Sequence, residues 1–489
     1  MLMNGKILKN YVNNKWIESK TEKTRDVINP ATGELVAKTP MSTKEETEEA
    51  IEAAKAAFWR WRTTPAQSRI RYLYDFRDAL EENFDELAEI CTIEHGKTLD
   101  ESRGEYRRTI ENVEAAASIP SLQMGYNFED VAAGIDEILI KQPLGVFFCV
   151  APFNFPAMVP AWFWPFAIAT GNSYIVKPSD QCPMTMAKQF ELLDEIDLPP
   201  GVINMVHGGA DVVNTLIESP DTIGMSFVGS TKIGKLLYKK CGEHGKRVQV
   251  QGGAKNFLTV MPDTNLERTV PNLITSFYGN AGQRCLAGGV LLAVGDIYEP
   301  LKVALLESAK KIVVGNGLEE STHMGPLASE AGKERVLKYI EKGIEEGADL
   351  ILDGRNVEVS KNVTEGFFIG PTIFDKVQPE MSIANEEIFG PVVPIIQVKD
   401  LNEAIEITNK SPYGNAASIF TASGKSARDF QYHVNAGNIG INIGVAAPIA
   451  TFPFSGMKDS FKGDLHGQGR NAVDFFTEEK VVITRWFEE

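Results

Sequence analysis

From residue 137 onward, short apolar segments of strand length alternate with stretches of helical length, and this alternation restricts the fold more than any other feature of the sequence. Such alternation predicts βαβ units and a parallel sheet. A second series begins past residue 255, which predicts two α/β lobes with a cleft between them. The expected strands are 146–150, 173–177, 202–206 and 225–228 in the first series, and 257–261 and 290–294 in the second.

The segments on either side of this region predict further elements. The first helix can begin at either of two overlapping capping boxes, Ser42–Glu45 or Thr43–Glu46. Near the C-terminus, residues 474–486 alternate apolar and polar side chains as a strand does. Such a strand pairs either with another subunit or with an edge strand of its own chain, for which 136–140 is the candidate. The N-terminal part predicts a hairpin around 12–15 and helical blocks over 42–62, 65–94 and 99–117.

One uncharged run, 142–176, is long enough to span a bilayer. Five prolines interrupt it too often for a continuous helix, and Asn154 and Asn172 add polar groups. A buried strand, a loop and a short buried helix are therefore expected here, and no membrane anchor.

The charge of the chain excludes several classes of partner. The 489 residues carry a formal charge of −17, whereas nucleic-acid binding needs clustered Lys and Arg. The same acidic excess disfavours docking on anionic lipid. The N-terminus has no apolar leader, and the five scattered cysteines predict no disulfide framework. A cytoplasmic protein is therefore expected, of two to four domains at about 100–200 residues each.

Cys285 is the candidate nucleophile. It lies in the segment GNAGQRC (279–285), whose small residues leave room for close backbone approach, and the adjacent Arg284 favours the thiolate, which is the nucleophilic form. The alternative is a cysteine that packs after the end of a helix. No metal site is expected, because the sequence contains neither a CxxC pair nor HExxH.

Two turns after expected strands are candidates for binding a nucleotide. Gly229 and Ser230 stand between a strand and a helix, where backbone N–H groups bind phosphate. Lys177 and Asp180 follow another strand, and in a doubly wound sheet ligands bind at the carboxyl ends of strands. The alternatives are an ordinary strand–helix turn for the first and a solvated, salt-bridged loop for the second.

The sequence resembles the aldehyde dehydrogenase superfamily over essentially its whole length. Five motifs occur in the superfamily's order and spacing: PFNFP (152–156), VKPS (176–179), FVGSTKIG (227–234), GQRC (282–285) and EEIFGP (386–391). Within the superfamily it looks like the CoA-acylating methylmalonate/malonate-semialdehyde dehydrogenases. That likeness rests on residues 104–113, 253–256, 279–287, 440–448, 452–456 and 460–463.

The resemblance implies an α/β subunit of aldehyde dehydrogenase-like fold. Its parts would be a doubly wound NAD-binding domain (1–121 and 141–251), an α/β catalytic domain (252–459) and a β-strand oligomerisation flap (122–140 and 460–489). The subunit would assemble as a homodimer or homotetramer, with NAD as cofactor and coenzyme A as co-substrate.

The resemblance also implies roles for individual residues. Cys285 would be the nucleophile, and the Asn154 amide with the Cys285 N–H would form the oxyanion hole. Asp180, beside Lys177 at the adenine ribose, would repel a 2′-phosphate and so favour NAD over NADP. The other expected cofactor contacts are Gly229 and Ser230 at the pyrophosphate, Glu387 and Phe389 at the nicotinamide ribose, and Phe153.

Gln251 stands where hydrolytic relatives have a glutamate that activates water. A glutamine amide is neutral and is not a general base, whereas a thiolate attacks a thioester readily. Release of the acyl group to coenzyme A is therefore expected. The alternatives are a hydrolytic NAD(P)-dependent aldehyde dehydrogenase of broader specificity and a non-enzymatic scaffold or binding protein.

The expected substrate is a small aldehyde that carries a carboxylate. By resemblance Arg108 and Arg284 would hold that carboxylate, since guanidinium–carboxylate pairing supplies both charge and geometry. In the alternative, Arg108 belongs to an exposed helix face with Glu105 and Glu111 as its neighbours. A β-carboxylate next to the thioester formed by oxidation could leave as carbon dioxide, so that after transfer to coenzyme A malonate semialdehyde would give acetyl-CoA and methylmalonate semialdehyde propionyl-CoA. The sequence does not rank these two substrates and does not locate the CoA site.

Overall fold

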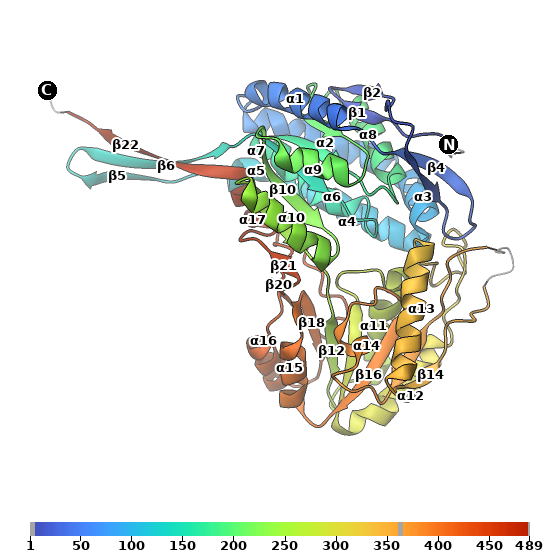
Figure 1. Cartoon of the computed structure of the whole chain (residues 1–489). Coiled ribbons are helices and arrows are strands. Elements are labelled where there is room, and N and C mark those ends of the chain that lie inside the picture. The colour runs from blue at the N-terminus through green and yellow to red at the C-terminus, as the bar shows by residue number, and fades with distance from the viewer. Residues whose placement is uncertain (1–4, 360–364, 488–489) are drawn as a thin grey trace.

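The computed structural model of the chain describes residues 5–359 and 365–487, which form two lobes and a long arm (Figure 1). The first lobe contains an eight-stranded sheet in the order β2-β1-β9-β8-β7-β10-β11-β21. Its central strands β9, β8, β7, β10 and β11 are parallel, as the alternation predicted. The bounds are β1 (Asn10–Val12), β2 (Lys15–Ile17), β7 (Val146–Val150), β8 (Ser173–Lys177), β9 (Ile203–Met205), β10 (Thr222–Val228), β11 (Arg247–Gln251) and β21 (Phe461–Lys462).

The strand order of this sheet reverses at β7, which has β8 on one side and β10 on the other. Ligands of doubly wound sheets bind outside the carboxyl ends of the strands at such a reversal. The turns that follow β7, β8 and β10 therefore form the expected binding edge of the first lobe. The expected hairpin around 12–15 is confirmed, because β1 pairs with β2 in register.

The helices of the first lobe agree with the sequence expectation except at one point. Of the two possible capping boxes, Thr43–Glu46 forms. The block expected over 65–94 is two helices, because the Asn83 side chain donates a 2.8 Å hydrogen bond to the Ala79 carbonyl and ends the first of them. The bounds are α1 (Lys44–Trp61), α2 (Ala66–Glu82), α3 (Phe84–His95), α4 (Leu99–Ala116), α5 (Ile119–Leu122), α8 (Met184–Glu195), α9 (Ala210–Glu218) and α10 (Thr231–Glu243).

The uncharged run forms the interior of the first lobe. Strand β7 is followed by a loop, the short helices α6 (Met158–Ala161) and α7 (Trp164–Thr170), and the fully buried strand β8. The expectation of a buried strand, a loop and a short buried helix is confirmed. Within the described ranges, no helix combines the length and the apolar character needed to cross a membrane.

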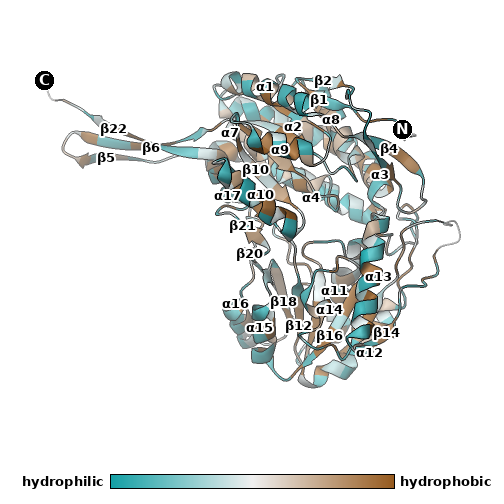
Figure 2. Ribbon diagram, in the orientation of Figure 1, coloured by the Kyte–Doolittle hydropathy of each residue, from teal (hydrophilic) through white to brown (hydrophobic). Residues whose placement is uncertain are grey.

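The second lobe contains a seven-stranded sheet in the order β14-β15-β16-β13-β12-β18-β19, parallel except for β14. Figure 2 shows hydrophobic strands β12 and β16 inside this lobe and the polar helices α15 and α16 on its outside. The strands are β12 (Asn256–Val260), β13 (Gly288–Val294), β14 (Asp349–Leu352), β15 (Thr372–Asp375), β16 (Val392–Val398), β18 (Ala416–Phe420) and β19 (Asn438–Ile441). The helices are α11 (Leu266–Tyr278), α12 (Tyr298–Ala309), α13 (Glu330–Glu345), α14 (Ser382–Asn385), α15 (Leu401–Lys410) and α16 (Gly424–His433).

Two small ribbons complete the body of the protein. One is the antiparallel pair of β3 (Thr24–Ile28) and β4 (Leu35–Pro40). The other pairs β17 (Tyr413–Gly414) with β20 (Met457–Lys458) and lies where the C-terminal segment returns to the first lobe.

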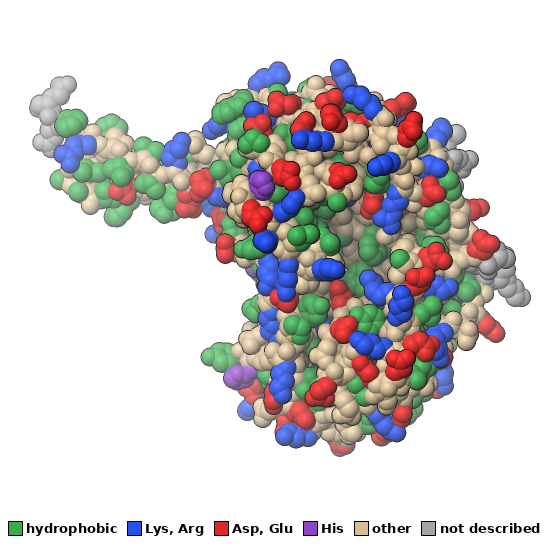
Figure 3. Space-filling view, viewed as in Figure 1, with side chains coloured by type: hydrophobic (Ala, Val, Ile, Leu, Met, Phe, Trp, Pro, Cys, Tyr) green, Lys and Arg blue, Asp and Glu red, His purple; other side chains and the backbone are tan. Residues whose placement is uncertain are grey.

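The arm is a three-stranded antiparallel sheet of β5 (Asn127–Ala132), β6 (Ile135–Pro143) and β22 (Thr477–Arg485). Nine residue pairs join β22 to β6, so the two distant segments lie side by side. The strand expected from residue 474 begins only at Thr477, because 469–476 form the short helix α17, which packs on α7. Val481 and Ile483 of the arm are exposed, and Figure 3 shows hydrophobic side chains gathered along it.

Candidate active site

Cys285 follows an unusual turn at the end of α11. Asn280 and Ala281 adopt left-handed backbone angles, with φ of 54° and 49°, and Gly282 has φ of 75°. A Cβ atom on Gly282 would lie 2.3 Å from the carbonyl oxygen of Gly390, so only glycine fits between these backbones. The loop that carries Cys285 is therefore packed directly on the loop that carries Glu387 and Phe389.

Two asparagine side chains hold the peptide of Cys285. Asn256 and Asn415 donate hydrogen bonds of 2.9 and 2.8 Å to the Cys285 carbonyl oxygen. Asn256 is the first residue of β12, and Asn415 immediately precedes the neighbouring strand β18. No motif gives Asn415 a role, and its part in the site is visible only in three dimensions.

Cys285 opens into a cavity of about 80 Å³ that also contains both candidate arginines. Arg108 comes from α4 of the first lobe and Arg284 precedes the nucleophile, so residues 176 positions apart meet here. The rest of the lining is mostly apolar, as is usual for small-molecule sites. It includes Asn112, Phe155, Met158, Trp162, Leu286, Val445, Ala447, Pro448, Ala450, Phe454 and Gln468.

Both arginines already have a carboxylate partner within the chain. Arg284 lies 3.0 Å from Glu101, and both of these side chains are largely buried. The Arg108 guanidinium lies 2.8 Å from the Glu111 carboxylate, three residues further along the same helix, as expected if Arg108 belongs to an exposed helix face. The side chains of this pair are more exposed than those of Arg284 and Glu101. Each of the two guanidinium groups in the cavity thus forms an ion pair with an acidic side chain. A substrate carboxylate would compete with that side chain for the guanidinium.

The environment of Cys285 favours the neutral thiol in the ligand-free protein. Burial and the nearby Glu387 carboxyl raise the pKa of Cys285 to about 12, and Arg284 opposes this rise. The adjacent cation therefore acts in the direction expected from the sequence, but desolvation outweighs it.

Asn154 lies within reach of the nucleophile loop, because its side-chain amide donates a 3.0 Å hydrogen bond to the Gln283 carbonyl. Its own carbonyl oxygen accepts a 2.7 Å hydrogen bond from the Lys97 ammonium. Lys97 in turn forms a 2.6 Å ion pair with Glu105, and both side chains are fully buried. Glu105 also accepts hydrogen bonds from the N–H groups of residues 157 and 158, so this ion pair fixes both ends of the Asn154 turn.

Four expected cofactor residues lie at the binding edge of the first sheet. Lys177 ends β8, is buried, and donates a 2.8 Å hydrogen bond to the Gly208 carbonyl. Asp180 lies in the turn after it. Gly229 and Ser230 follow β10, and the Ser230 side chain makes no capping hydrogen bond at the start of α10. The hydroxyl and the first N–H groups of that helix suit a phosphate group.

The other expected cofactor residues come from both lobes. Phe153 and Phe389 contact each other edge to face, with ring centroids 5.9 Å apart, and Phe389 has a strained φ of 60°. Glu387 is partly buried, desolvation raises the pKa of its carboxyl, and it accepts a 2.9 Å hydrogen bond from the Ala254 N–H. Lys255 lines the same small cavity as Glu387 and Arg284, and burial lowers its pKa to about 7.

Gln251 is buried, and its amide donates a 3.0 Å hydrogen bond to the carbonyl of Phe454. Phe454 lines the Cys285 cavity, so Gln251 lies behind its wall. A different cavity, whose lining includes Asp464, contains neither Gln251 nor Cys285.

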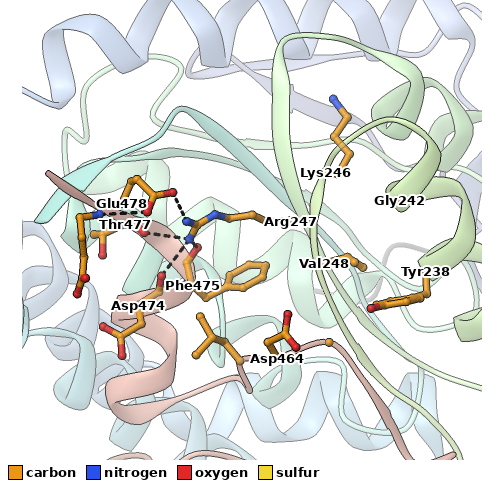
Figure 4. Close-up of a pocket in the computed structure, with 13 residues that line it drawn as sticks. Tyr238, Gly242, Lys246, Arg247, Val248, Asp464, Asp474, Phe475, Thr477 and Glu478 are labelled. Atoms are coloured by element: carbon orange, nitrogen blue, oxygen red, sulfur yellow. Dashed lines mark hydrogen bonds and ion pairs between the residues drawn. The ribbon is translucent and has the colours of Figure 1, made fainter.

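That second cavity, of about 510 Å³, lies at the base of the arm (Figure 4). Arg247 crosses it and donates hydrogen bonds to the carbonyls of residues 474, 475 and 477 and to the Glu478 carboxylate. The guanidinium thus joins β11 to the start of β22, and the cavity contains none of the expected site residues.

The chain belongs to the aldehyde dehydrogenase family, whose model matches residues 16–482. It is 48% identical to malonate-semialdehyde dehydrogenase 2 of Geobacillus kaustophilus over 480 residues, which cover 98% of this chain and 99% of that protein. The crystal structure of methylmalonate-semialdehyde dehydrogenase from Oceanimonas doudoroffii has a TM-score of 0.97 and 38% identity, over 99% of each chain. The NAD⁺ complex of an aldehyde dehydrogenase from Bacillus cereus has a TM-score of 0.94 and 30% identity, over 99% of this chain and 97% of that one. The expected fold class is confirmed.

The environment of Cys285 predicts the pH dependence of its alkylation. In the ligand-free protein, iodoacetamide should modify Cys285 slowly at pH 7, and the rate should rise about tenfold per pH unit up to pH 9.5 as the thiolate forms. Glu387→Gln should accelerate alkylation at pH 8 because it removes a neighbouring negative charge, and Arg284→Met should slow it. Mass spectrometry of the Cys285 peptide gives the rates.

Arg108→Met is the matched control, because Arg108 lines the same cavity without shifting the Cys285 pKa in the way Arg284 does. A rate that stays constant between pH 7 and 9 would show that the thiolate is already formed.

Proposed function

We propose that this protein catalyses the NAD-dependent, CoA-acylating oxidation of malonate or methylmalonate semialdehyde, with loss of carbon dioxide. The observation that carries the proposal is the cavity that brings Cys285, Arg108 and Arg284 together while the position of the hydrolytic base holds Gln251. The names of the relatives at 45–48% identity agree with this activity.

Different residues of the cavity bind the carboxylate and the aldehyde group of the substrate. Arg108 and Arg284 hold the substrate carboxylate, so the aldehyde carbon faces the sulfur of Cys285. Loss of the Cys285 proton to water and addition of the resulting thiolate to the aldehyde carbon give a thiohemiacetal, whose oxygen is stabilised by the Asn154 amide and the Cys285 N–H. Removal of one such donor typically costs about 10²–10³ in rate. NAD, when bound, accepts the hydride and so supplies the oxidising power.

The resulting thioester on Cys285 has two possible acceptors, water and the thiol of coenzyme A. Gln251 provides no base for water, and its amide is engaged by the Phe454 carbonyl. Loss of the carboxylate as carbon dioxide leaves the enolate of the thioester, and uptake of a proton from water at the α-carbon gives an acetyl or propionyl group on sulfur. The thiolate of coenzyme A then attacks the acyl carbon and Cys285 leaves, which gives acetyl-CoA or propionyl-CoA.

The expected cofactor residues bind successive parts of NAD, from the adenine ribose to the nicotinamide ribose. Lys177 and Asp180 hold the adenine ribose, and Gly229 and Ser230 the pyrophosphate. Glu387 and Phe389 hold the nicotinamide ribose, and Phe153 contacts Phe389 from the other lobe.

We also propose the domain division 1–121 and 141–251 for NAD binding, 252–459 for catalysis, and 122–140 with 460–489 as oligomerisation flap, in a cytoplasmic homodimer or homotetramer. The exposed arm supports the flap assignment. The segment 460–489 first adds β21 to the sheet of the first lobe and then α17, before it reaches the arm.

The absence of a base at Gln251 predicts that coenzyme A controls turnover. With malonate semialdehyde and NAD, one rapid burst of NADH should be followed by slow turnover, and coenzyme A should accelerate the slow phase. Gln251→Glu should add CoA-independent turnover, since base catalysis contributes about 10²–10⁴. Absorbance at the NADH band follows both phases.

Gln251→Ala is the matched control, because it removes the amide without adding a carboxylate, and Cys285→Ala should abolish the burst. Turnover that coenzyme A does not stimulate would refute acyl transfer and favour the hydrolytic activity.

The paired arginines predict a preference for a charged aldehyde. Arg284→Met and Arg108→Met should each lower kcat/KM for malonate semialdehyde relative to propanal by about 10–100-fold, as expected for a charge-assisted hydrogen bond. Arg103→Met, which removes an exposed arginine from the same helix, should leave the ratio unchanged. If neither cavity variant changes the ratio, the carboxylate is bound elsewhere.

The exposed apolar side chains of the arm predict assembly through it. The double variant Val481→Lys/Ile483→Lys should shift the protein to monomers in sedimentation at micromolar concentration. Thr484→Lys, on the opposite face of the same strand, is the control and should retain the oligomer. A monomeric parent protein would contradict the flap assignment.

A further inference from the structure

Asp180 is held from outside the first sheet by the ribbon of β3 and β4. The Arg25 guanidinium of β3 lies 2.8 Å from the Asp180 carboxylate oxygen Oδ2. The hydroxyl of Thr39, at the other strand of the ribbon, donates a 2.9 Å hydrogen bond to the Asp180 carbonyl. Both the side chain and the backbone of Asp180 are thus fixed by residues about 140–155 positions earlier in the chain.

This arrangement changes the charge at the ribose-binding edge. Asp180 alone would repel a 2′-phosphate, which was the basis for expecting NAD rather than NADP. Arg25 neutralises that carboxylate, and the buried Lys177 adds a second positive charge nearby. The three groups together carry a formal charge of +1 instead of the −1 of Asp180 alone.

The two partners offer different chemistry to a nucleotide. The ion pair uses Oδ2 of Asp180, which leaves Oδ1 to accept a hydrogen bond from a ribose hydroxyl. Arg25 is partly exposed, with 46% of its side chain accessible, and its remaining N–H groups suit the oxygens of a phosphate. Lys177 is buried and uses one of its three ammonium donors on the Gly208 carbonyl, whereas Arg25 is the more exposed cation and presents several further N–H groups.

We propose that Arg25 sets the cofactor selectivity of this enzyme by neutralising Asp180 and by offering its guanidinium to the 2′-phosphate of NADP. This inference rests on the proposed NAD-dependent function and adds a determinant from the N-terminal ribbon. The hydrogen bond from a hydroxyl of the adenine ribose to Asp180 favours NAD. Arg25 attracts the 2′-phosphate of NADP, so the difference in affinity between NAD and NADP is small. Substitution of Asp180 frees Arg25 for the phosphate and shifts the preference towards NADP.

The test measures binding without catalysis. Isothermal titration calorimetry of the full chain gives the Kd of ADP-ribose and of ADP-ribose 2′-phosphate at low salt, where exposed charges are least screened. Arg25→Ala should weaken the 2′-phosphate compound about tenfold relative to ADP-ribose, within the range of a charged hydrogen bond. Asp180→Asn should strengthen it by a similar factor, and Arg25→Ala/Asp180→Asn should lose that gain.

Arg103→Ala is the matched control, because the Arg103 side chain is about as exposed as that of Arg25 and also forms an ion pair with an aspartate, Asp85, on the surface of α3 and α4. It should leave both Kd values unchanged. Equal effects of Arg25→Ala on the two ligands would overturn the selectivity role while leaving the proposed function intact. Failure of the parent protein to bind ADP-ribose would instead overturn the cofactor site itself, and the role of Arg25 with it.

Discussion

The buried ion pair between Lys97 and Glu105 is the interaction on which the candidate site depends. Two opposite charges without solvent are stable only when their remaining hydrogen-bonding capacity is used, and here it is. Lys97 donates to the Asn154 carbonyl, and Glu105 accepts the two N–H groups that follow the Asn154 turn. Loss of one partner of such a pair typically costs about 3–5 kcal/mol, because the other charge stays buried. The position of the Asn154 amide beside the nucleophile loop is therefore secured by the interior of the first lobe.

Much of the fold could be predicted from local patterns. The alternation from residue 137 indicated the parallel strands, and the prolines of the uncharged run indicated short buried elements rather than one long helix. The break at Asn83 was missed, because a side-chain cap inside a continuous helical pattern has no periodic signal. The last turn of α17, residues 474–476, was assigned to the strand for a similar reason, since its apolar residues fit a strand as well as a helix.

Some residues of the candidate site could be identified from the sequence, and others only from the structure. Cys285, Arg284 and Gln251 stand in motifs and could be selected from the sequence, although the roles of these residues remain predictions. From the sequence, Glu105 was expected only as a neighbour of Arg108 on an exposed helix face. In the structure its side chain is buried and forms an ion pair with Lys97. Asn415 and Arg25 lie more than a hundred residues from their partners, and no spacing rule connects such positions. Partners of this kind follow from the topology of the sheets and not from the local chain.

The contact of Gly282 with Gly390 joins the nucleophile loop to the loop of Glu387 and Phe389 without any room for a side chain. Neither loop can shift alone, because the backbone of one fills the space beside the backbone of the other. The distance between the reactive sulfur and the cofactor-binding loop is consequently fixed when the chain folds. Ligands that enter the cleft meet a geometry that is already assembled, and the entropic cost of arranging it has been met by folding instead of by binding.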